Sequence, residues 1–171
     1  MTKHTRGFTL VETLVSILLF ATIAMIVGSV FVSSLDLQRR ANNLQQTEEN
    51  ASYVLETMIK EIRVSTLPVA LADTDCAAAP LPAMAIINSS GVLVVYSLNG
   101  TDLIRNAGGV DGVMNSNTVQ FQRLAFCVSG AQPSDSKQPR ITIIASIQSK
   151  NMKQQITVDT QTTISLRGLS D

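Results

Sequence analysis

Histidine and tryptophan are almost missing from this 171-residue chain, which has one histidine, His4, and no tryptophan. Relays that pair a serine or cysteine with an imidazole, and metal sites with histidine ligands, therefore have almost no residues to draw on. No glycine-rich phosphate loop follows a strand pattern and precedes a helix pattern. The composition thus argues against an enzyme, and no cofactor is indicated.

Charge is also scarce. Charged residues make up 15% of the chain and hydrophobic residues 45%, and 13 basic side chains balance 13 acidic ones. A net charge of zero gives no overall field that favours nucleic acid or an anionic surface. The basic residues of the second half are scattered: they are Arg105, Arg123, Lys137, Arg140, Lys150 and Lys153. Binding to nucleic acid is therefore not expected.

Residues 13–32 contain no charged side chain at all. At about 1.5 Å per residue, a helix of this length matches the roughly 30 Å hydrocarbon core of a bilayer. A buried core helix is the alternative, but a helix that is apolar on every face needs a larger host than this chain. No second run of this kind follows, so we expect one membrane span with the rest of the chain on one side.

The order of residues before this run is unlike a secretory signal, which is cut after its apolar region. Here basic Lys3 and Arg6 precede Gly7, and the apolar segment starts only after that glycine. Glu12 then stands at the start of the uncharged run, where a carboxylate costs roughly 3 kcal/mol. A favourable interaction with the helix dipole accounts for part of this placement. It does not explain the whole order of residues.

Residues 7–12, Gly-Phe-Thr-Leu-Val-Glu, with the apolar run behind them, resemble the class III signal of type IV prepilins and pseudopilins. The resemblance implies that a membrane-embedded prepilin peptidase cuts between Gly7 and Phe8 and methylates the new amine of Phe8. It also implies that Glu12 guides entry into a filament, where pairing with a neighbour's amine offsets the cost of the buried carboxylate. A cut before the apolar segment retains that segment, first as anchor and then as assembly core.

The resemblance also implies partners and a location. The partners are the prepilin peptidase, other pilin or pseudopilin subunits and an inner-membrane assembly platform. The chain would cross the cytoplasmic membrane once with its head outside the cytoplasm, and then enter a pilus or pseudopilus. Basic residues do not decide this orientation, because Lys3 and Arg6 on one side equal Arg39 and Arg40 on the other.

Helix-forming residues continue to Arg63, and the first proline is Pro68. A stripe at alternating spacings of four and three is apolar except for one glutamate; it comprises Leu37, Ala41, Leu44, Glu48, Ala51, Leu55, Met58 and Ile62. The stripe could form a two-stranded coiled coil, but we favour packing of its lower half against the chain's own sheet, as pilins do. Residues 55–63 also resemble the helix of J-type minor pseudopilins and W-type minor pilins.

Strand patterns follow the helix, so the fold class is α+β with a long N-terminal helix on an antiparallel sheet. The expected strands are residues 85–88, 92–98, 102–105, 118–128, 141–150 and 155–166, in a meander of four to six strands. Asn99-Gly100 predicts a hairpin, and residues 106–117 and 130–139 read as exposed loops. The expected divisions are leader 1–7, transmembrane and assembly helix 8–33, amphipathic helix 34–65 and β head 66–171.

Two cysteines, Cys76 and Cys127, lie far apart in the sequence, and both fall outside the cytoplasm in this topology. An isolated pair in an oxidising compartment favours a disulfide over a metal site, which usually needs four ligands. Two free thiols are the alternative. Asp73 and Asp75 form a carboxylate pair for which solvation is the expected state.

The leading hypothesis is a structural subunit, a minor pilin or pseudopilin of a pilus or a type II secretion pseudopilus. Non-closing contacts between such subunits would generate a helical filament. The alternative is a ligand-binding minor pilin for DNA uptake or adhesion, which would need a basic or aromatic surface patch. A membrane-anchored enzyme is the third hypothesis, and the missing histidine weighs against it.

Overall fold

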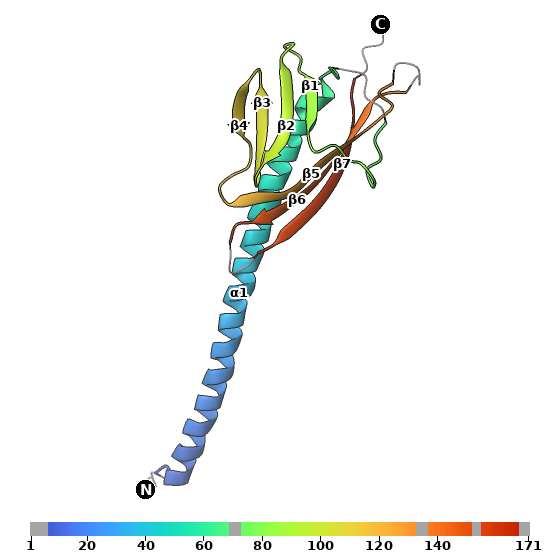
Figure 1. The fold of residues 1–171 in the computed structure, drawn as a ribbon. Helices are drawn as coiled ribbons and strands as arrows, with labels where there is room; N and C mark the ends of the chain where they lie inside the picture. The colour runs from blue at the N-terminus through green and yellow to red at the C-terminus, as the bar shows by residue number, and fades with distance from the viewer. Residues whose placement is uncertain (1–6, 69–72, 133–136, 152–154, 168–171) are drawn as a thin grey trace. The chain divides into compact units, whose positions relative to one another are not determined.

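The computed structural model describes residues 7–68, 73–132, 137–151 and 155–167. The chain divides into two compact units, residues 1–42 and 43–171, and each is described by itself. The expected leader, apart from Gly7, lies outside the described residues. The helix α1, Leu10–Arg63, provides all the helix of the first unit and the start of the second (Figure 1).

In the first unit, α1 exposes its apolar side chains on every face. Every large hydrophobic residue from Leu10 to Val32 is exposed. An isolated helix with such a surface is not a stable arrangement in water, because apolar area stays in contact with solvent. This part of α1 therefore needs a bilayer or neighbouring chains around it.

In the second unit, α1 buries one face made of Thr47, Ala51, Val54, Leu55, Met58 and Ile62. Burial of the C-terminal half of the predicted stripe, from Ala51 to Ile62, is thus confirmed. The N-terminal half of the stripe, for which no packing was predicted, is exposed at Leu37 (68%) and Leu44 (38%). The stripe missed Val54, which widens the buried face beyond a coiled-coil seam into the broader stripe typical of a helix on a sheet.

The first sheet, sheet A, has the order β1-β2-β3-β4, with every pair antiparallel. Its strands are β1 Met84–Ile87, β2 Leu93–Asn99, β3 Asp102–Ala107 and β4 Val110–Val113. The predicted hairpin is confirmed, although its two turn residues are Gly100 and Thr101, because Asn99 pairs with Asp102. Gly100 has a φ of 61°, a conformation that glycine adopts without strain.

Strand β4 corrects the expected loop at residues 106–117. Gly108 and Gly109 have φ values of 59° and 90° and form a two-residue turn that folds β4 back onto β3. All four residues of β4 are exposed, and Asp111-Gly112 in its centre has low strand propensity. Pairing with β3, rather than the strand's own residues, makes this segment a strand.

The second sheet, sheet B, has the order β5-β6-β7, again antiparallel, with strands β5 Val119–Ser129, β6 Arg140–Ser149 and β7 Thr157–Ser165. The described residues of the head therefore form seven strands in two sheets, not one meander of four to six. The change of sheet occurs at Asn115, whose buried side chain accepts from Leu103 N at 2.8 Å and donates to Val119 O at 3.1 Å. These bonds replace a hairpin between β4 and β5.

One core joins the helix and both sheets. Met58 and Ile62 of α1 lie in the same buried cluster as Tyr96 of β2, Phe126 of β5 and Ile143 of β6. Along β6, buried residues that face the core alternate with part-exposed residues of the opposite face. The α+β class, with a long N-terminal helix packed on antiparallel sheets, is confirmed.

Candidate functional site

The predicted cleavage bond lies in the irregular chain just before the helix. Gly7 and Phe8 precede α1, and Phe8 is 77% exposed. A Cβ placed on Gly7 would meet nothing within 4 Å. The Gly7–Phe8 bond is thus unshielded by the described residues, as a protease substrate must be.

Thr9 caps the helix that follows. Its Oγ1 accepts from the backbone N–H of Glu12 at 3.3 Å, and its carbonyl accepts from Glu12 N and Thr13 N at 3.1 and 3.2 Å. Glu12 is the third helical residue, where a carboxylate is favoured by the helix dipole. The spacing Thr9-x-x-Glu12 is a readable capping signal that sequence reasoning missed. It also places Phe8 outside the helix rather than as its first residue.

Beyond the cap, α1 has the composition of a membrane span. An eighteen-residue window reaches a mean hydropathy of 2.6, and none of it is buried. Among the described residues this is the one helix long and apolar enough to cross a membrane. The predicted cleavage bond, the cap with Glu12 and the apolar surface thus follow one another along a single stretch of chain.

Cys76 and Cys127 form a disulfide, with their Cα atoms 5.4 Å apart. It ties the segment after α1 to β5, where Leu81 and Phe126 exchange backbone hydrogen bonds of 2.7 and 2.8 Å. Asp73 and Asp75 are exposed, as expected of solvated carboxylates, and each also accepts one backbone hydrogen bond. Asp73 Oδ1 accepts from Gly130 N at 2.8 Å, and Asp75 Oδ1 accepts from Ala77 N at 2.8 Å. Both carboxylates hold backbone of this region in place.

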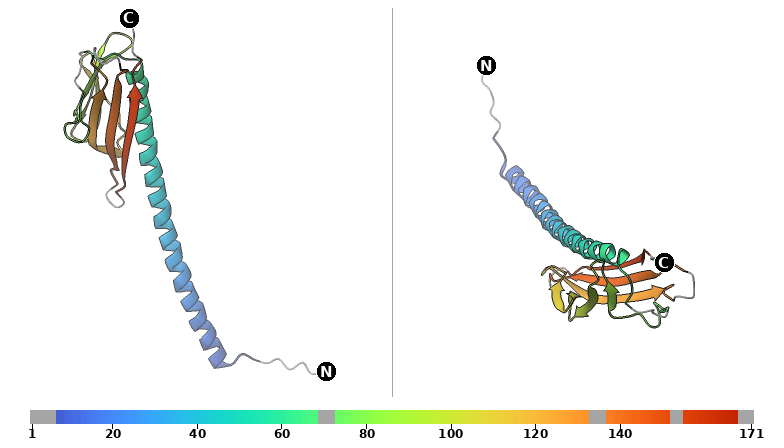
Figure 2. Two further views of the ribbon diagram at one scale, coloured as in Figure 1. Left: turned by 90° about the vertical axis from the view of Figure 1, so that its right-hand side faces the viewer. Right: turned by 90° about the horizontal axis from the view of Figure 1, so that it is seen from above.

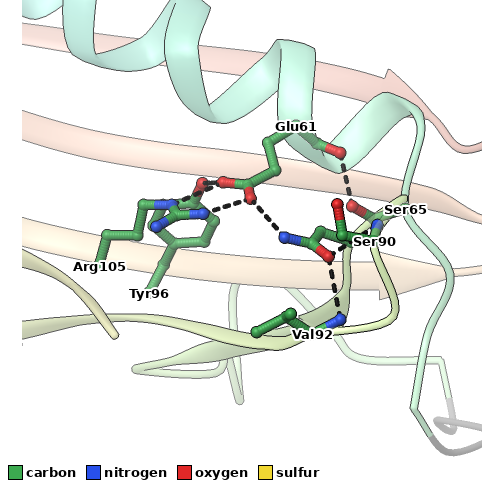
Figure 3. A network of polar contacts seen from close by, with 7 residues as sticks. Glu61, Ser65, Ser90, Val92, Tyr96 and Arg105 are labelled. Carbon is green, nitrogen blue, oxygen red and sulfur yellow. Dashed lines mark hydrogen bonds and ion pairs between the residues drawn. The ribbon is translucent and has the colours of Figure 1, made fainter. Parts of the chain in front are cut away.

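A polar network joins the end of α1 to sheet A, outside the membrane-spanning segment (Figure 3). The Glu61 carboxylate accepts from Arg105 Nη2 at 2.6 Å and from Arg105 Nε at 2.8 Å, a bidentate ion pair. It also accepts from the hydroxyl of Tyr96, which is fully buried, and from Asn88 Nδ2 at 3.4 Å. Residues from α1, β2 and β3, and the turn after β1, meet at one carboxylate.

Mutual stabilisation shifts the pKa values of this network. The hydrogen bond from Arg105 lowers the pKa of Glu61 from 4.5 to about 2, against the opposing effect of burial. Burial, followed by the hydrogen bond to Glu61, raises the pKa of Tyr96, and the bond to Glu61 raises that of Arg105. Every lone pair that Glu61 offers is directed at a donor of its own chain. The network therefore links α1 to sheet A and leaves no free carboxylic acid at Glu61.

Sequence reasoning did not find this network. Arg105 counted among the scattered basic residues, and Glu61 only as part of a helix resemblance. Glu61 does lie one turn after the buried Met58 and next to the buried Ile62, which was the available signal for a carboxylate near the core. No group of His, Cys, Asp and Glu suited to a metal ion occurs within the described ranges.

Comparison with protein families finds one model that matches, the prokaryotic N-terminal methylation motif, over residues 2–28. Comparison with curated proteins and with solved structures gives no match. The matched residues span the expected cleavage bond, the capped Glu12 and the first turns of the apolar helix. This motif is the class III signal of type IV pilins and pseudopilins, a family of structural proteins. The match over residues 2–28 supports a type IV pilin-like precursor with a class III signal peptide.

Proposed function

We propose that this protein is a minor pilin or pseudopilin that enters a pilus or a type II secretion pseudopilus. A prepilin peptidase cuts between Gly7 and Phe8 and methylates the amine of Phe8. The processed chain then leaves the membrane through an inner-membrane assembly platform and packs against other pilin or pseudopilin subunits.

The observation that carries this proposal is that the methylation motif runs directly into a helix that is apolar on all sides. The motif covers residues 2–28, and the large hydrophobic residues of α1 up to Val32 are exposed. In a bilayer this surface contacts lipid. In a filament, the same surface contacts neighbouring helices without a change in its own structure, so one segment serves both stages.

Glu12 favours movement of the chain from the membrane into the filament. In an apolar filament core a lone carboxylate is costly, whereas a carboxylate beside a neighbour's ammonium is stabilised. Cleavage creates such an ammonium on Phe8. Because Thr9 caps the helix, Glu12 is fixed in the first turn, close in sequence to the new terminus.

The disulfide supports a head outside the cytoplasm, since disulfides persist in oxidising compartments. No specific observation favours the ligand-binding alternative. Within the described part of residues 43–171, Tyr53 is the one aromatic side chain that is largely exposed, at 68%.

Co-expression with a prepilin peptidase, followed by intact-mass measurement, tests the cleavage. We expect loss of residues 1–7 and one added methyl group when the peptidase is present, and the full-length mass when it is absent. A Gly7→Val variant should keep its leader in both conditions because a branched side chain replaces the unhindered glycine. Full-length mass of the unaltered chain in the presence of an active peptidase would overturn the proposal.

A further inference from the structure

Two of the four sheet edges in the head are closed by the chain itself. On β1, Ile87 exchanges backbone hydrogen bonds of 2.8 and 2.9 Å with Thr66. On β5, backbone groups bond to Thr74, Leu81 and Thr101. Such capping is how native proteins prevent unwanted pairing at an edge strand.

The edge of β7 is open. Ser149 N donates to Ile156 O and Leu166 N donates to Pro139 O, so the even-numbered residues of this strand bond to β6. The N–H and C=O groups of the odd-numbered residues therefore point away from β6. These residues are Thr157, Asp159, Gln161, Thr163 and Ser165. Among the described residues, no backbone partner closes these five positions. Figure 2 shows β7 at the border of sheet B.

The residues of this open edge are suited to pairing. All five are exposed, and β7 contains four threonines, one charged residue and no lysine or proline. Threonine favours strands, whereas lysine and proline are the residues that usually protect an edge. The other open edge, β4, has four residues and a central glycine, and only Asp111 and Val113 face outward there. β7 is the longer and more regular of the two.

A hollow beside β7 adds a second, independent feature. It has a volume of about 300 Å³ on the outer face of sheet B, and Arg123, Ser146, Asp159 and Gln161 line it. Arg123, Ser146 and Asp159 lie in one row across the three strands. Asp159 forms no ion pair with any residue the structure describes. Its carboxylate is at the edge, where the next strand of a longer sheet would place a side chain beside it.

We propose that β7 accepts an extended strand of a neighbouring pilin-like subunit, which continues sheet B and places a basic side chain next to Asp159. This inference rests on the proposed function, because it names a contact within the filament. An added strand supplies the acceptors and donors that the five outward positions lack, and main-chain bonds of this kind provide affinity in strand addition generally. Asp159, which has no ion pair among the described residues, makes the choice of strand selective.

Hydrogen exchange on the full chain tests the contact directly. In the detergent-solubilised chain, the outward amides of β7 should exchange quickly, because they have no partner. In the sheared filament fraction, peptides that cover residues 157–165 should exchange at least tenfold more slowly. Unchanged exchange in filaments that do contain the processed chain overturns the strand-addition proposal and leaves the proposed function standing. Failure of the chain to enter filaments would instead contradict the proposed function.

Matched variants separate backbone pairing from side-chain effects. Gln161→Pro removes an outward N–H without removing a bond to β6, and should reduce incorporation into filaments severalfold. Gln161→Ala keeps that N–H and should incorporate normally. Asp159→Lys should also reduce incorporation, whereas Asp111→Lys on β4 should not. Circular dichroism of each variant verifies folding. Equal incorporation of folded Gln161→Pro and Gln161→Ala, or of Asp159→Lys and Asp111→Lys, would contradict the proposal.

Discussion

Glu61 bonds at once to three side chains of sheet A and its turns, so its replacement would break three contacts of the folded chain. Its removal leaves the buried Tyr96 hydroxyl without its acceptor and Arg105 without its counter-ion. The side chains of Glu61 and Arg105 are 17% and 31% exposed, so solvent only partly replaces the lost contacts. The network is therefore a determinant of stability rather than of surface charge.

Replacement of Glu61 by alanine should lower the free energy of unfolding by about 2 kcal/mol. The matched control is Glu56→Ala on the same helix. Glu56 pairs with Lys60 at 3.5 Å, but both side chains are more than half exposed, so its loss should cost less than about 0.5 kcal/mol. Chemical denaturation compares the two, and equal losses would show that the Glu61 network does not stabilise the head.

The lowered pKa of Glu61 predicts a pH dependence of stability. The folded pKa is about 2 against an ordinary value of 4.5, so the folded state favours the ionised form. The contribution is fully present above about pH 4.5 and is lost as the pH falls toward 2. In Glu61→Gln this contribution is missing, so the stability difference from the unaltered chain should shrink between about pH 6 and about pH 3. A constant difference would contradict the shifted pKa.

At the scale of elements, the buried face of α1 determines how much the packing of the helix on the two sheets contributes to stability. Met58 is completely buried in the cluster that joins α1 to both sheets. Met58→Ala should cost about 3 kcal/mol, because it removes apolar contacts and leaves a cavity. Leu44→Ala, at a position that is 38% exposed, should cost well under half as much. Thermal denaturation of the two variants distinguishes a helix packed along this face from one packed along the whole predicted stripe.

The disulfide is the second link between elements. Its sequence separation is 51, and closing a loop of that size contributes about 4 kcal/mol in the chain-entropy model. The double variant Cys76→Ser and Cys127→Ser should therefore unfold at markedly lower denaturant concentration, and reduction of the unaltered chain should match it. A thiol assay completes the test: two free thiols in unreduced protein would refute the bond.

Local sequence signals were sufficient for some elements and not for others. The charge-free run, the heptad positions from Ala51 onward and Asn99-Gly100 each act over a few residues, and the elements they predicted are present. β4 depends on two glycines that permit a tight turn, while Asp111 and Gly112 in its centre are poor strand formers. The split into two sheets depends on Asn115, whose side chain bonds to Leu103, twelve residues earlier, and to Val119 at the start of β5. Long-range contacts of this kind leave no periodic pattern in the sequence.

The candidate site divides in the same way. Gly7, Phe8 and Glu12 lie within six consecutive residues of the matched motif, so the sequence alone is enough to propose them. Glu61 and Arg105 are 44 residues apart and meet only when β3 packs beside α1. Among many glutamates and arginines, nothing in the sequence marks these two as partners. A carboxylate adjacent to a buried helical position is the strongest hint available.

For the whole molecule, Glu12 should separate membrane insertion from assembly. Glu12→Ala removes a charge from the start of an apolar helix, so insertion should be unimpaired or improved. Filament entry should fall about tenfold or more, because the pairing with a neighbour's amine is lost. The measurement is the ratio of the chain in sheared filaments to the chain in membranes. Gln45→Ala, on an exposed part of the same helix, is the control and should leave this ratio unchanged.

The central claim is that one helix is first a membrane anchor and then part of a filament, with the cut after Gly7 as the event between them. Mass spectrometry of the N-terminal peptide in separate membrane and sheared-filament fractions tests this most directly. The account predicts that the filament fraction contains only chains that begin with methylated Phe8, while chains with the leader remain in the membrane. Chains that retain the leader in filaments, or processed chains that never leave the membrane of a filament-forming cell, would contradict it.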